Sequence, residues 1–507
     1  MSDEIAVILD CYTVEPSGLG VPPYLSTYVR TAYAAVTSSR PLAQIRYLTI
    51  DDVRWCLNGG APFVEEPLSD PLTYSTTIHR DEALRLLADA ALVVVVAGDA
   101  VPSVHLHAQN GSLEEIGRAL TYVRGRTVLL GPLASLVGGK SSAGARLFDV
   151  VHTHTVTAGD LLLGSDRAAS YDGLRADRSS YAGLVEQLSW RPVAEIELYR
   201  GCTRRRFCSF CNEPVKASRV EFRAVEDVVE EVRQLAAAGV RHFRLGQQTC
   251  FFSYAGRNPA VIEQLLRGVR EACPDLEVLH IDNADPLAVA SPAGARIAKL
   301  VAAYCSEGNC APMGIESFDP VVVERNALTC TPEILTRAVG HVNEAGASRG
   351  PGGLPLLLPG LNLIYGLPGE TDRTHAANLV GLARIFEAGF LCHRTNVRAA
   401  RAYPGTPLAA MNDGTSSSSS TRFAAWKSDI DQLWDLPMKA RVYPTGLRVS
   451  GLHAFFVSTA GTWHRRLGSY AIQILEPDTA RVRYDTGAVT VTGHAPRHLY
   501  GQRHVAA

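Results

Sequence analysis

Apolar and polar positions alternate in two ways along the first 165 residues of the chain. Short runs of β-branched and other apolar residues, typical of buried strands, are separated by stretches in which apolar residues recur every three or four positions, as in helices. The expected strands cover residues 5–9, 46–50, 92–97, 127–130 and 150–152. Continuous apolar strands with helices between them predict a parallel sheet covered on both faces.

This alternation is typical of a Rossmann-like α/β domain, which we place over residues 1–185. Dinucleotide-binding domains of this type carry a G-x-G-x-x-G turn after the first strand. Here the sequence continues with Asp10, Cys11 and Tyr12. The sequence therefore gives no support for a dinucleotide ligand.

A second series of strands and helices is expected over residues 186–411. Its predicted strands are 195–199, 243–246, 277–281, 311–315, 361–365 and 394–397, and its predicted helices include 225–238, 260–272, 295–304, 332–345 and 374–388. Six strand–helix repeats predict a partial (β/α)6 barrel, whose chemistry lies at the C-terminal ends of the strands.

A polar segment of low complexity, with serine at every position from 416 to 420, follows this series. It has no apolar surface to bury, so we interpret residues 412–440 as a linker followed by a helix. In residues 441–507, short runs rich in Val, Tyr, Phe and Thr alternate with glycines. This pattern predicts a small antiparallel β-barrel or sheet, and the fold class as a whole is α/β.

Composition and charge indicate which classes of binding partner are not expected. Hydrophobic residues make up 46% and charged residues 20% of the 507 residues, as in globular proteins of several domains. The formal net charge of -2 gives no indication of a nucleic-acid partner. The longest apolar runs, 90–97 and 353–358, are too short to cross a bilayer, so we expect no membrane partner.

The 11 cysteines are an odd number, and no signal peptide is evident at the N-terminus. This usage argues against a disulfide framework and favours a reducing, cytoplasmic location with free, catalytic or metal-bound cysteines.

Three of the cysteines, Cys202, Cys208 and Cys211, lie within ten residues directly after the first strand of the predicted barrel. Three thiolates can hold a four-iron cubane and leave one iron open, and an open iron can chelate the amino and carboxylate groups of a ligand. The alternatives are incidental cysteines or a structural zinc site, which would need Cys250 or His242 as a fourth ligand at an unusual spacing.

This motif and its context resemble the radical S-adenosylmethionine (radical SAM) superfamily. The resemblance implies a [4Fe–4S] cluster on the three cysteines, with Phe210 beside the adenine of SAM. The commonest family spacing is C-x3-C-x2-C, whereas this chain has C-x5-C-x2-C, with the added residues at 204–206. An arginine in this longer loop is expected to raise the cluster potential by stabilising the more negative reduced state.

Further motifs match the superfamily at the predicted strand ends, and the SAM contacts that they imply are these. Gly246, Gln247 and Gln248 would receive the amino group, Glu316 and Ser317 the ribose or carboxylate, Gly366, Pro368 and Gly369 the adenine, and Arg394 and Asn396 belong to the sixth strand.

Polar residues also end the third predicted strand of the barrel. We predict that His280, Asp282 and Asp285 contact the substrate as catalytic residues, because polar clusters at this face of a barrel usually do. Cys305 and Cys310 are small buried residues in the simpler interpretation, with hydrogen-atom donation or an auxiliary metal as the alternative. The paired histidines 105/107 and 152/154 have no acidic or thiol neighbours in sequence, and we interpret them as core or surface residues.

The order of the domains resembles methylthiotransferases and cobalamin-dependent radical SAM methyltransferases. Methylthiotransferases hold a second cluster on three N-terminal cysteines, but here only Cys11 is in place, with Gly98 and Pro132 at the other two positions. A second cluster is therefore not expected. The D-x-H-x-x-G motif of many cobalamin proteins is also missing, which argues against cobalamin, although cobalamin can bind without that histidine.

The chain also resembles a group of prokaryotic, notably archaeal, radical SAM proteins that share the segments LGVPPY (19–24) and RLGSY (466–470). The resemblance thus predicts an enzyme that cleaves SAM reductively, with an electron from a donor such as flavodoxin or ferredoxin, and modifies an unidentified substrate. The alternatives are cobalamin-dependent methyl transfer, methylthiotransferase-like modification of RNA or protein, and a non-catalytic iron–sulfur scaffold.

Overall fold

The computed structural model describes residues 4–13, 23–60, 76–98, 109–137, 143–153, 155–163, 170–177, 181–217, 219–411, 420–479 and 487–503. The chain divides into two compact units, the first comprising 1–196 and 227–243 and the second 197–226 and 244–507. The predicted segments 19–22, His105, His107, His154 and 412–419 lie outside the described residues.

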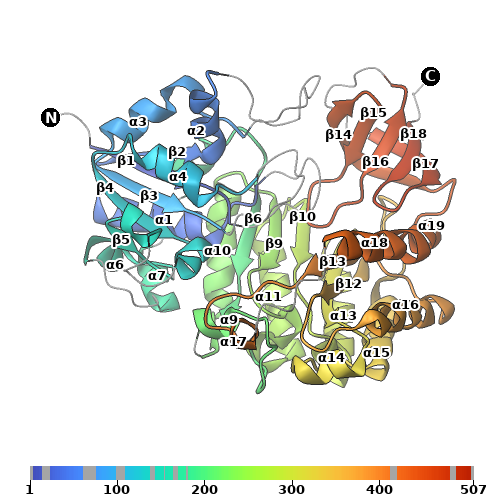
Figure 1. Ribbon diagram of the computed structural model, residues 1–507. Helices are drawn as coiled ribbons and strands as arrows, with labels where there is room; N and C mark the ends of the chain where they lie inside the picture. Colours follow the sequence, from blue (N-terminus) through green and yellow to red (C-terminus); the bar gives the residue numbers. More distant parts are fainter. Residues whose placement is uncertain are drawn as a thin grey trace. The chain divides into compact units, whose positions relative to one another are not determined.

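The first unit is built on a five-stranded parallel sheet (Figure 1). Its strands run in the order β2-β1-β3-β4-β5, with β1 Ile5–Asp10, β2 Gln44–Thr49, β3 Leu92–Val96, β4 Arg126–Leu130 and β5 Val150–Val151. The helices are α1 Thr27–Ser39, α2 Ile50–Leu57, α3 Ala83–Asp89, α4 Leu113–Leu120, α5 Pro132–Leu136, α6 Ala158–Leu163, α7 Tyr171–Asp177 and α8 Ala182–Val185. The parallel sheet predicted for this region is therefore present.

Alternate residues of the strands divide the core of this unit between two faces. Val7 and Leu9 of β1 point to the face on which α2, α3 and α4 pack, together with Val93 and Val95 of β3. Helix α1 contacts β1, β2 and β3 as well as α6 and α7. The central strands β1 and β3 are almost entirely apolar because helices cover both faces.

Helix α10 (Val225–Ala237) begins in the second unit, but most of it belongs to the first. A buried ion pair connects this helix to the rest of the first unit, since the Arg30 Nε of α1 lies 3.0 Å from the Glu231 Oε1 of α10. The predicted boundary at residue 185 does not anticipate this long-range pairing.

The six strands predicted for the barrel form two three-stranded sheets. One has the order β10-β9-β6, with β6 Val193–Glu197, β9 His242–Gly246 and β10 Val278–Ile281; the division between the units falls within β6 and β9. The other has the order β11-β12-β13 and is parallel, with β11 Asn309–Glu316, β12 Leu357–Tyr365 and β13 Thr395–Ala399. A parallel bridge between Ala284 and Met313 joins β10 to β11.

Most helices of this part begin with a capping residue followed by proline. Asn258, Asp285, Ser291, Asp319 and Thr331 each accept a hydrogen bond from the first turn of the helix that they precede, and each is followed by Pro at the first helical position. This pair of residues starts a helix sharply after a strand. The helices are α11 Pro259–Ala272, α12 Pro286–Val289, α13 Pro292–Tyr304, α14 Pro320–Arg325, α15 Pro332–Gly346 and α16 Asp372–Glu387.

The second unit also contains β7 Tyr199–Arg200, β8 Glu221–Phe222, α9 Glu213–Lys216, α17 Pro407–Met411, α18 Ser420–Ile430, a π-helical turn Asp431–Asp435 and α19 Leu436–Val442. The C-terminal strands close into a barrel in the order β14-β15-β16-β18-β17 (Figure 1). They are β14 Arg448–Ser458, β15 Gly461–Arg465, β16 Ile474–Pro477, β17 Gly487–His494 and β18 Leu499–Arg503. The pairs are antiparallel except β16 with β18, which is parallel.

The mixed α/β class with parallel sheets is confirmed, while the four predicted domain boundaries stay predictions. Within the described residues, we find no helix with the length and apolar character needed to cross a membrane.

Candidate functional site

The cysteine loop follows β7 in the second unit and is fixed at its start. Gly201 has a φ of 80°, and a Cβ at this position would lie 2.6 Å from the Arg219 carbonyl oxygen, so only glycine fits. The Tyr199 hydroxyl donates to the Cys250 carbonyl (2.7 Å) and accepts from the Cys250 N–H (2.9 Å). These contacts attach the start of the loop to the segment that follows β9.

Cys202, Cys208 and Cys211 are all half-buried and near one another. Burial is the main cause that raises the pKa of Cys211 to about 12, and the negative charge of Glu213 adds to the shift. Burial also raises the pKa of Cys202 and Cys208. The thiols are therefore protonated at neutral pH, and a metal must displace their protons when it binds.

Arg204 is the residue of the longer loop that reaches these thiols. Its Nη1 donates to the Sγ of Cys208 at 2.8 Å, and its Nε lies 2.9 Å from Oδ2 of Asp285. Arg205, Arg206 and Phe207 are exposed instead. In this longer loop Arg204 therefore contacts a predicted cluster ligand, whereas the side chains of Arg205 and Arg206 are exposed to solvent.

The donor set of this loop fits an iron–sulfur cluster better than a single ion. Among the described residues, no three His, Cys, Asp or Glu side chains are placed to share one metal ion. A four-iron cluster makes a different demand, because each cysteine binds a separate iron. Three neighbouring thiols on one loop, with an N–H donor on one sulfur, satisfy that demand.

The segment after β9 contains two of the predicted SAM contacts in unusual states. Gln247 has a φ of 63°, which is uncommon for a residue other than glycine. Gln248 is buried, and its Nε2 donates to the Leu245 carbonyl at 2.8 Å. Its Oε1 is buried without a hydrogen-bond partner among the described residues. Gly246 is the last residue of β9.

Glu316 ends β11 in a strained conformation, with a φ of 59°. Its carboxyl group folds back over Gly314, where a Cβ would lie 2.4 Å from Oε1. Oε2 has no hydrogen-bond partner among the described residues, and burial raises the pKa of Glu316 to about 8. Ser317 differs, because its hydroxyl accepts from the Asp319 N–H at 3.1 Å and thus supports the start of α14.

Phe210 and the turn after β12 come together, although they are far apart in sequence. Phe210 packs against the apolar cluster that contains Leu367. In this turn Gly366 and Gly369 have φ of 88° and 93°, and Gly366 donates its N–H to Oε2 of Glu370 at 2.6 Å. The Pro368 carbonyl accepts from Nδ2 of Asn326 at 2.8 Å. These hydrogen bonds hold the turn in place, and its two glycines have no side chain that would keep a ligand away from the backbone.

Arg394 and Asn396 lie on β13 or just before it, and protein groups contact both. The Arg394 guanidinium lies over the ring of Tyr470, 5.3 Å from its centroid. The side-chain oxygen of Asn396 accepts a hydrogen bond from Nε of Arg398 at 2.9 Å. Their predicted contact with SAM stays a prediction.

His280 and Asp282 contact a segment that the sequence did not indicate. Nδ1 of His280 accepts from the Ser469 N–H at 3.1 Å, and Oδ1 of Asp282 accepts from the Tyr470 hydroxyl at 2.9 Å. Arg244 also pairs with Asp282 at 2.5 Å. The segment 466–470, which connects β15 to β16, therefore contacts the polar end of β10, and burial lowers the pKa of His280 to about 4.

Asp285 is not part of this group, since it caps α12 and pairs with Arg204. The predicted triad of His280, Asp282 and Asp285 thus divides between two environments. Whether any of its members touches substrate stays a prediction. The only signal for the 466–470 segment in the sequence is the RLGSY motif, whose role could not be read without its contacts.

Replacing Gly468 with alanine is expected to detach this segment and lower thermal stability. Gly468 has a φ of 127°, and a Cβ would lie 2.8 Å from Cε1 of His280, which is buried. Overpacking of this kind costs about 1–3 kcal/mol. Calorimetry on Gly446→Ala is the matched control, because Gly446 has a φ of 88° and no atom within 4 Å of the added Cβ. Equal losses in the two variants would contradict the role of close packing on His280.

Comparisons with known proteins show the family of this chain. The family model "Radical SAM superfamily" matches residues 196–379. An uncharacterized protein of Methanocaldococcus jannaschii is 34% identical over 474 residues, which cover 87% of this chain and 82% of the relative. The chain belongs to the radical SAM superfamily. Enzymes of this superfamily carry an iron–sulfur cluster and bind SAM, so the chain is a radical SAM enzyme.

Two further similarities bear on the layout of this radical SAM enzyme. A tRNA-2-methylthio-N(6)-dimethylallyladenosine synthase of Methylacidiphilum infernorum is 27% identical over 125 residues, which cover 23% of this chain and 26% of that enzyme. The solved structure of the cobalamin-dependent radical SAM enzyme OxsB matches with a TM-score of 0.50 and 13% identity, covering 82% of this chain and 56% of that one. At this identity the likeness to OxsB shows the fold alone.

Cys11, Gly98 and Pro132 lie at the C-terminal ends of β1, β3 and β4 or directly after them. The Cys11 N–H donates to the Val96 carbonyl and the Gly98 N–H to the Tyr12 carbonyl, so the strand ends are adjacent. The radical SAM enzyme thus has one thiol where a methylthiotransferase-like site would have three. Cys305 and Cys310 are buried, and burial raises the pKa of each thiol to about 12.

Asp10 is also at this edge of the first unit, 2% exposed at the end of β1. Burial raises its pKa to about 7, although hydrogen bonds from the Tyr47 hydroxyl (2.7 Å) and the Tyr12 N–H (2.8 Å) oppose the shift.

Asp10→Asn is therefore expected to gain stability relative to the wild-type enzyme as the pH rises from 4 to 7. In this window the unfolded carboxyl is ionised while the folded one stays protonated, so the wild type loses about 1.4 kcal/mol per pH unit. Thermal midpoints measured from pH 4.5 to 7.5 test this difference. Asp172→Asn is the control, since Asp172 is 88% exposed, and a pH-independent gap between Asp10→Asn and wild type would contradict the prediction.

Proposed function

We propose that this enzyme holds a [4Fe–4S] cluster on Cys202, Cys208 and Cys211, binds SAM beside it and modifies an unidentified substrate. The observation that carries the proposal is a loop with three half-buried thiols within ten residues, in which Arg204 donates to the sulfur of Cys208. When bound and reduced, the cluster would supply the electron that cleaves SAM to methionine and a 5′-deoxyadenosyl radical, which abstracts hydrogen from the substrate.

The surrounding residues support a polar ligand at this place. Buried polar atoms are normally hydrogen-bonded, so the unpartnered Oε1 of Gln248 and Oε2 of Glu316 are expected to bond a ligand. Glu316 holds a proton at neutral pH because burial raises its pKa to about 8. It can therefore donate to a hydroxyl, or ionise when a cationic group such as an ammonium approaches.

The aromatic and glycine-containing elements support a flat group next to the loop. Phe210 would cover one side of the adenine, and the turn with Gly366 and Gly369 would offer backbone groups at close range. The hydrogen bonds from Gly366 to Glu370 and from Asn326 to Pro368 hold this turn in place without a ligand. The site would thus be largely formed before SAM binds.

Anaerobic reconstitution with iron and sulfide, followed by dithionite and SAM, tests the proposal. We expect absorption near 400 nm, about four irons per chain, and formation of 5′-deoxyadenosine and methionine. A cluster that assembles but releases no 5′-deoxyadenosine would instead favour the non-catalytic scaffold. A preparation that holds no cluster would overturn the proposal.

The first unit gives little support for cobalamin. Its sheet order is the flavodoxin-like one, in which ligands bind at the ends of β1 and β3. At this edge the side chains of Asp10 and Tyr12 are already engaged, since they bond to Tyr47 and Asp51. We propose a reaction that does not depend on cobalamin, with cobalamin-dependent methyl transfer as the alternative. A titration with hydroxocobalamin that shifts its visible spectrum would contradict this part of the proposal.

A further inference from the structure

The environment of Arg204 points to a role that goes beyond holding the loop. Its side chain is only 19% exposed, and it bridges two groups, Sγ of Cys208 at 2.8 Å and Oδ2 of Asp285 at 2.9 Å. The guanidinium has donors in a fixed planar fork, so bonding one group with Nε orients Nη1 toward the other. The contact with sulfur is therefore directed.

Asp285 is itself held by contacts that do not involve Arg204. Its Oδ1 accepts from the Leu287 N–H at 3.0 Å as the cap of α12, and its own N–H donates to Sγ of Cys250 at 3.1 Å. The cap leaves Oδ2 as the oxygen that faces Arg204. The position of Arg204 is thus set by a helix start in the core of the second unit, rather than by the cysteine loop alone.

A hydrogen bond to a cysteine sulfur stabilises the reduced form of an iron–sulfur cluster. Reduction adds a negative charge that is shared by the thiolate ligands, and an N–H dipole or a cation nearby lowers its energy. Asp285 offsets part of the charge of Arg204, so the directed N–H···S bond remains as the main local effect. The reduction potential of the cluster is therefore expected to be higher with this bond than without it.

We propose that Arg204 is a positioning residue that raises the reduction potential of the cluster through its bond to Cys208, and that Asp285 aims it. The proposal rests on the proposed function, since it needs a cluster on the three cysteines. It assigns Asp285 to the cluster side of the site rather than to the substrate. It also gives the longer C-x5-C spacing a purpose, because the two added residues fall within the five-residue run 203–207 that contains Arg204.

The test is a redox titration of the reconstituted enzyme under anaerobic conditions, followed by electron paramagnetic resonance. Arg204→Gln is expected to reduce the ratio of reduced to oxidised cluster about tenfold at a fixed potential, a shift of about 59 mV for one electron. Arg205→Gln is the matched control, because Arg205 is the exposed neighbour in the same loop. Its midpoint potential is expected to equal that of the wild type.

A second variant keeps the test decisive if Arg204→Gln fails to hold a cluster. Arg204→Lys retains the charge but not the fork that reaches both partners, so it is also expected to shift the midpoint downward. Resonance Raman spectra give a separate readout, since the iron–sulfur stretching bands of the wild type should shift in D2O and those of Arg204→Lys should shift less. An unchanged midpoint in a variant that holds its cluster would overturn the proposal.

The measurements distinguish a failure of the proposed function from a failure of the role of Arg204. If the wild-type enzyme assembles no cluster, the proposed function fails with it. If the wild type holds a cluster and releases 5′-deoxyadenosine while Arg204→Gln or Arg204→Lys titrates like the wild type, only the role of Arg204 is wrong.

Discussion

Replacing Cys211 with alanine is expected to abolish both the iron–sulfur absorption and the formation of 5′-deoxyadenosine. The loop offers three thiols, and each would bind a different iron, so the loss of one leaves two open irons. Cys250 and Cys330 are buried thiols of the second unit that lie outside this loop in sequence. Cys250 is also engaged, as the acceptor of the Asp285 N–H.

The measurement combines iron content, absorption near 400 nm and chromatography of the SAM products. Cys56→Ala is the matched control, since Cys56 is a half-buried thiol of the first unit and is expected to leave all three readouts unchanged. A Cys211→Ala enzyme that keeps its absorption and still cleaves SAM would refute the assignment of the cluster ligands. A variant that keeps the absorption without cleavage would place Cys211 in SAM binding instead.

The elements of the fold were predictable because their signals are local. Strands such as β1 and β3 are almost entirely apolar, and the pairs Asp285-Pro286, Ser291-Pro292 and Asp319-Pro320 mark helix starts that need no distant partner. The observed strands β9 and β10 differ from the predicted ones by a residue at their starts. Local patterns of this kind also led to the cysteine loop, whose three thiols are near one another in sequence.

The partners of the predicted site residues were not predictable in the same way. His280 and Asp282 are bonded to Ser469 and Tyr470, which are 189 and 188 residues away. No periodicity connects segments at this distance, and the contact depends on a glycine, Gly468, that lets the backbone approach His280. The division of the polar triad between Arg204 and the C-terminal segment is likewise a property of the packed structure.

The longer cysteine loop shows how a departure from a family pattern becomes informative only with side-chain contacts. The spacing alone indicated that an arginine could lie near the cluster, but it did not distinguish among Arg204, Arg205 and Arg206. The structure does so, because Arg204 contacts Cys208 and Asp285 while the next two residues are exposed.

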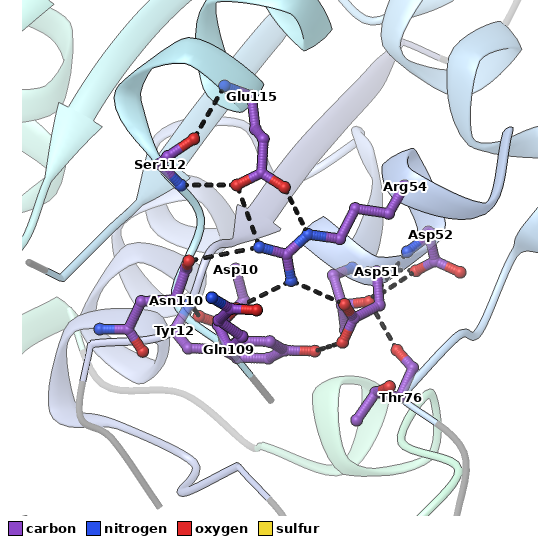
Figure 2. A network of polar contacts seen from close by, with 11 residues as sticks. Asp10, Tyr12, Asp51, Asp52, Arg54, Thr76, Gln109, Asn110, Ser112 and Glu115 are labelled. Atoms are coloured by element: carbon purple, nitrogen blue, oxygen red, sulfur yellow. Dashed lines mark hydrogen bonds and ion pairs between the residues drawn. The ribbon is translucent and has the colours of Figure 1, made fainter. Parts of the chain in front are cut away.

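The second large effect is expected in the first unit, from Arg54→Met. Figure 2 shows the Arg54 guanidinium at the centre of a polar network, between Asp51 and Glu115. Its Nη1 lies 2.8 Å from Oδ1 of Asp51 and its Nε 2.7 Å from Oε1 of Glu115, and it also donates to the carbonyls of Gln109 (2.8 Å) and Asn110 (3.3 Å). Its side chain is 4% exposed.

Methionine would fill much of the same volume but leave two carboxylates and two carbonyls without this donor. Removing one partner of a buried ion pair costs about 3–5 kcal/mol, because the remaining charges stay desolvated. We expect the thermal transition of the first unit to fall by about 10 °C. Glu115 would also lose a partner while it caps α4 through Ser112, so the start of that helix should loosen as well.

Hydrogen exchange and calorimetry check this prediction. Arg85→Met is the matched control, since Arg85 is 60% exposed and pairs with Glu82 and Asp89 on the surface, where an ion pair contributes at most about 1 kcal/mol. Arg54→Lys should recover only part of the loss, because one ammonium cannot reach two carboxylates and two carbonyls in the geometry of a planar fork. If Arg54→Met lowered the transition temperature no more than Arg85→Met, the prediction that this network stabilises the first unit would be wrong.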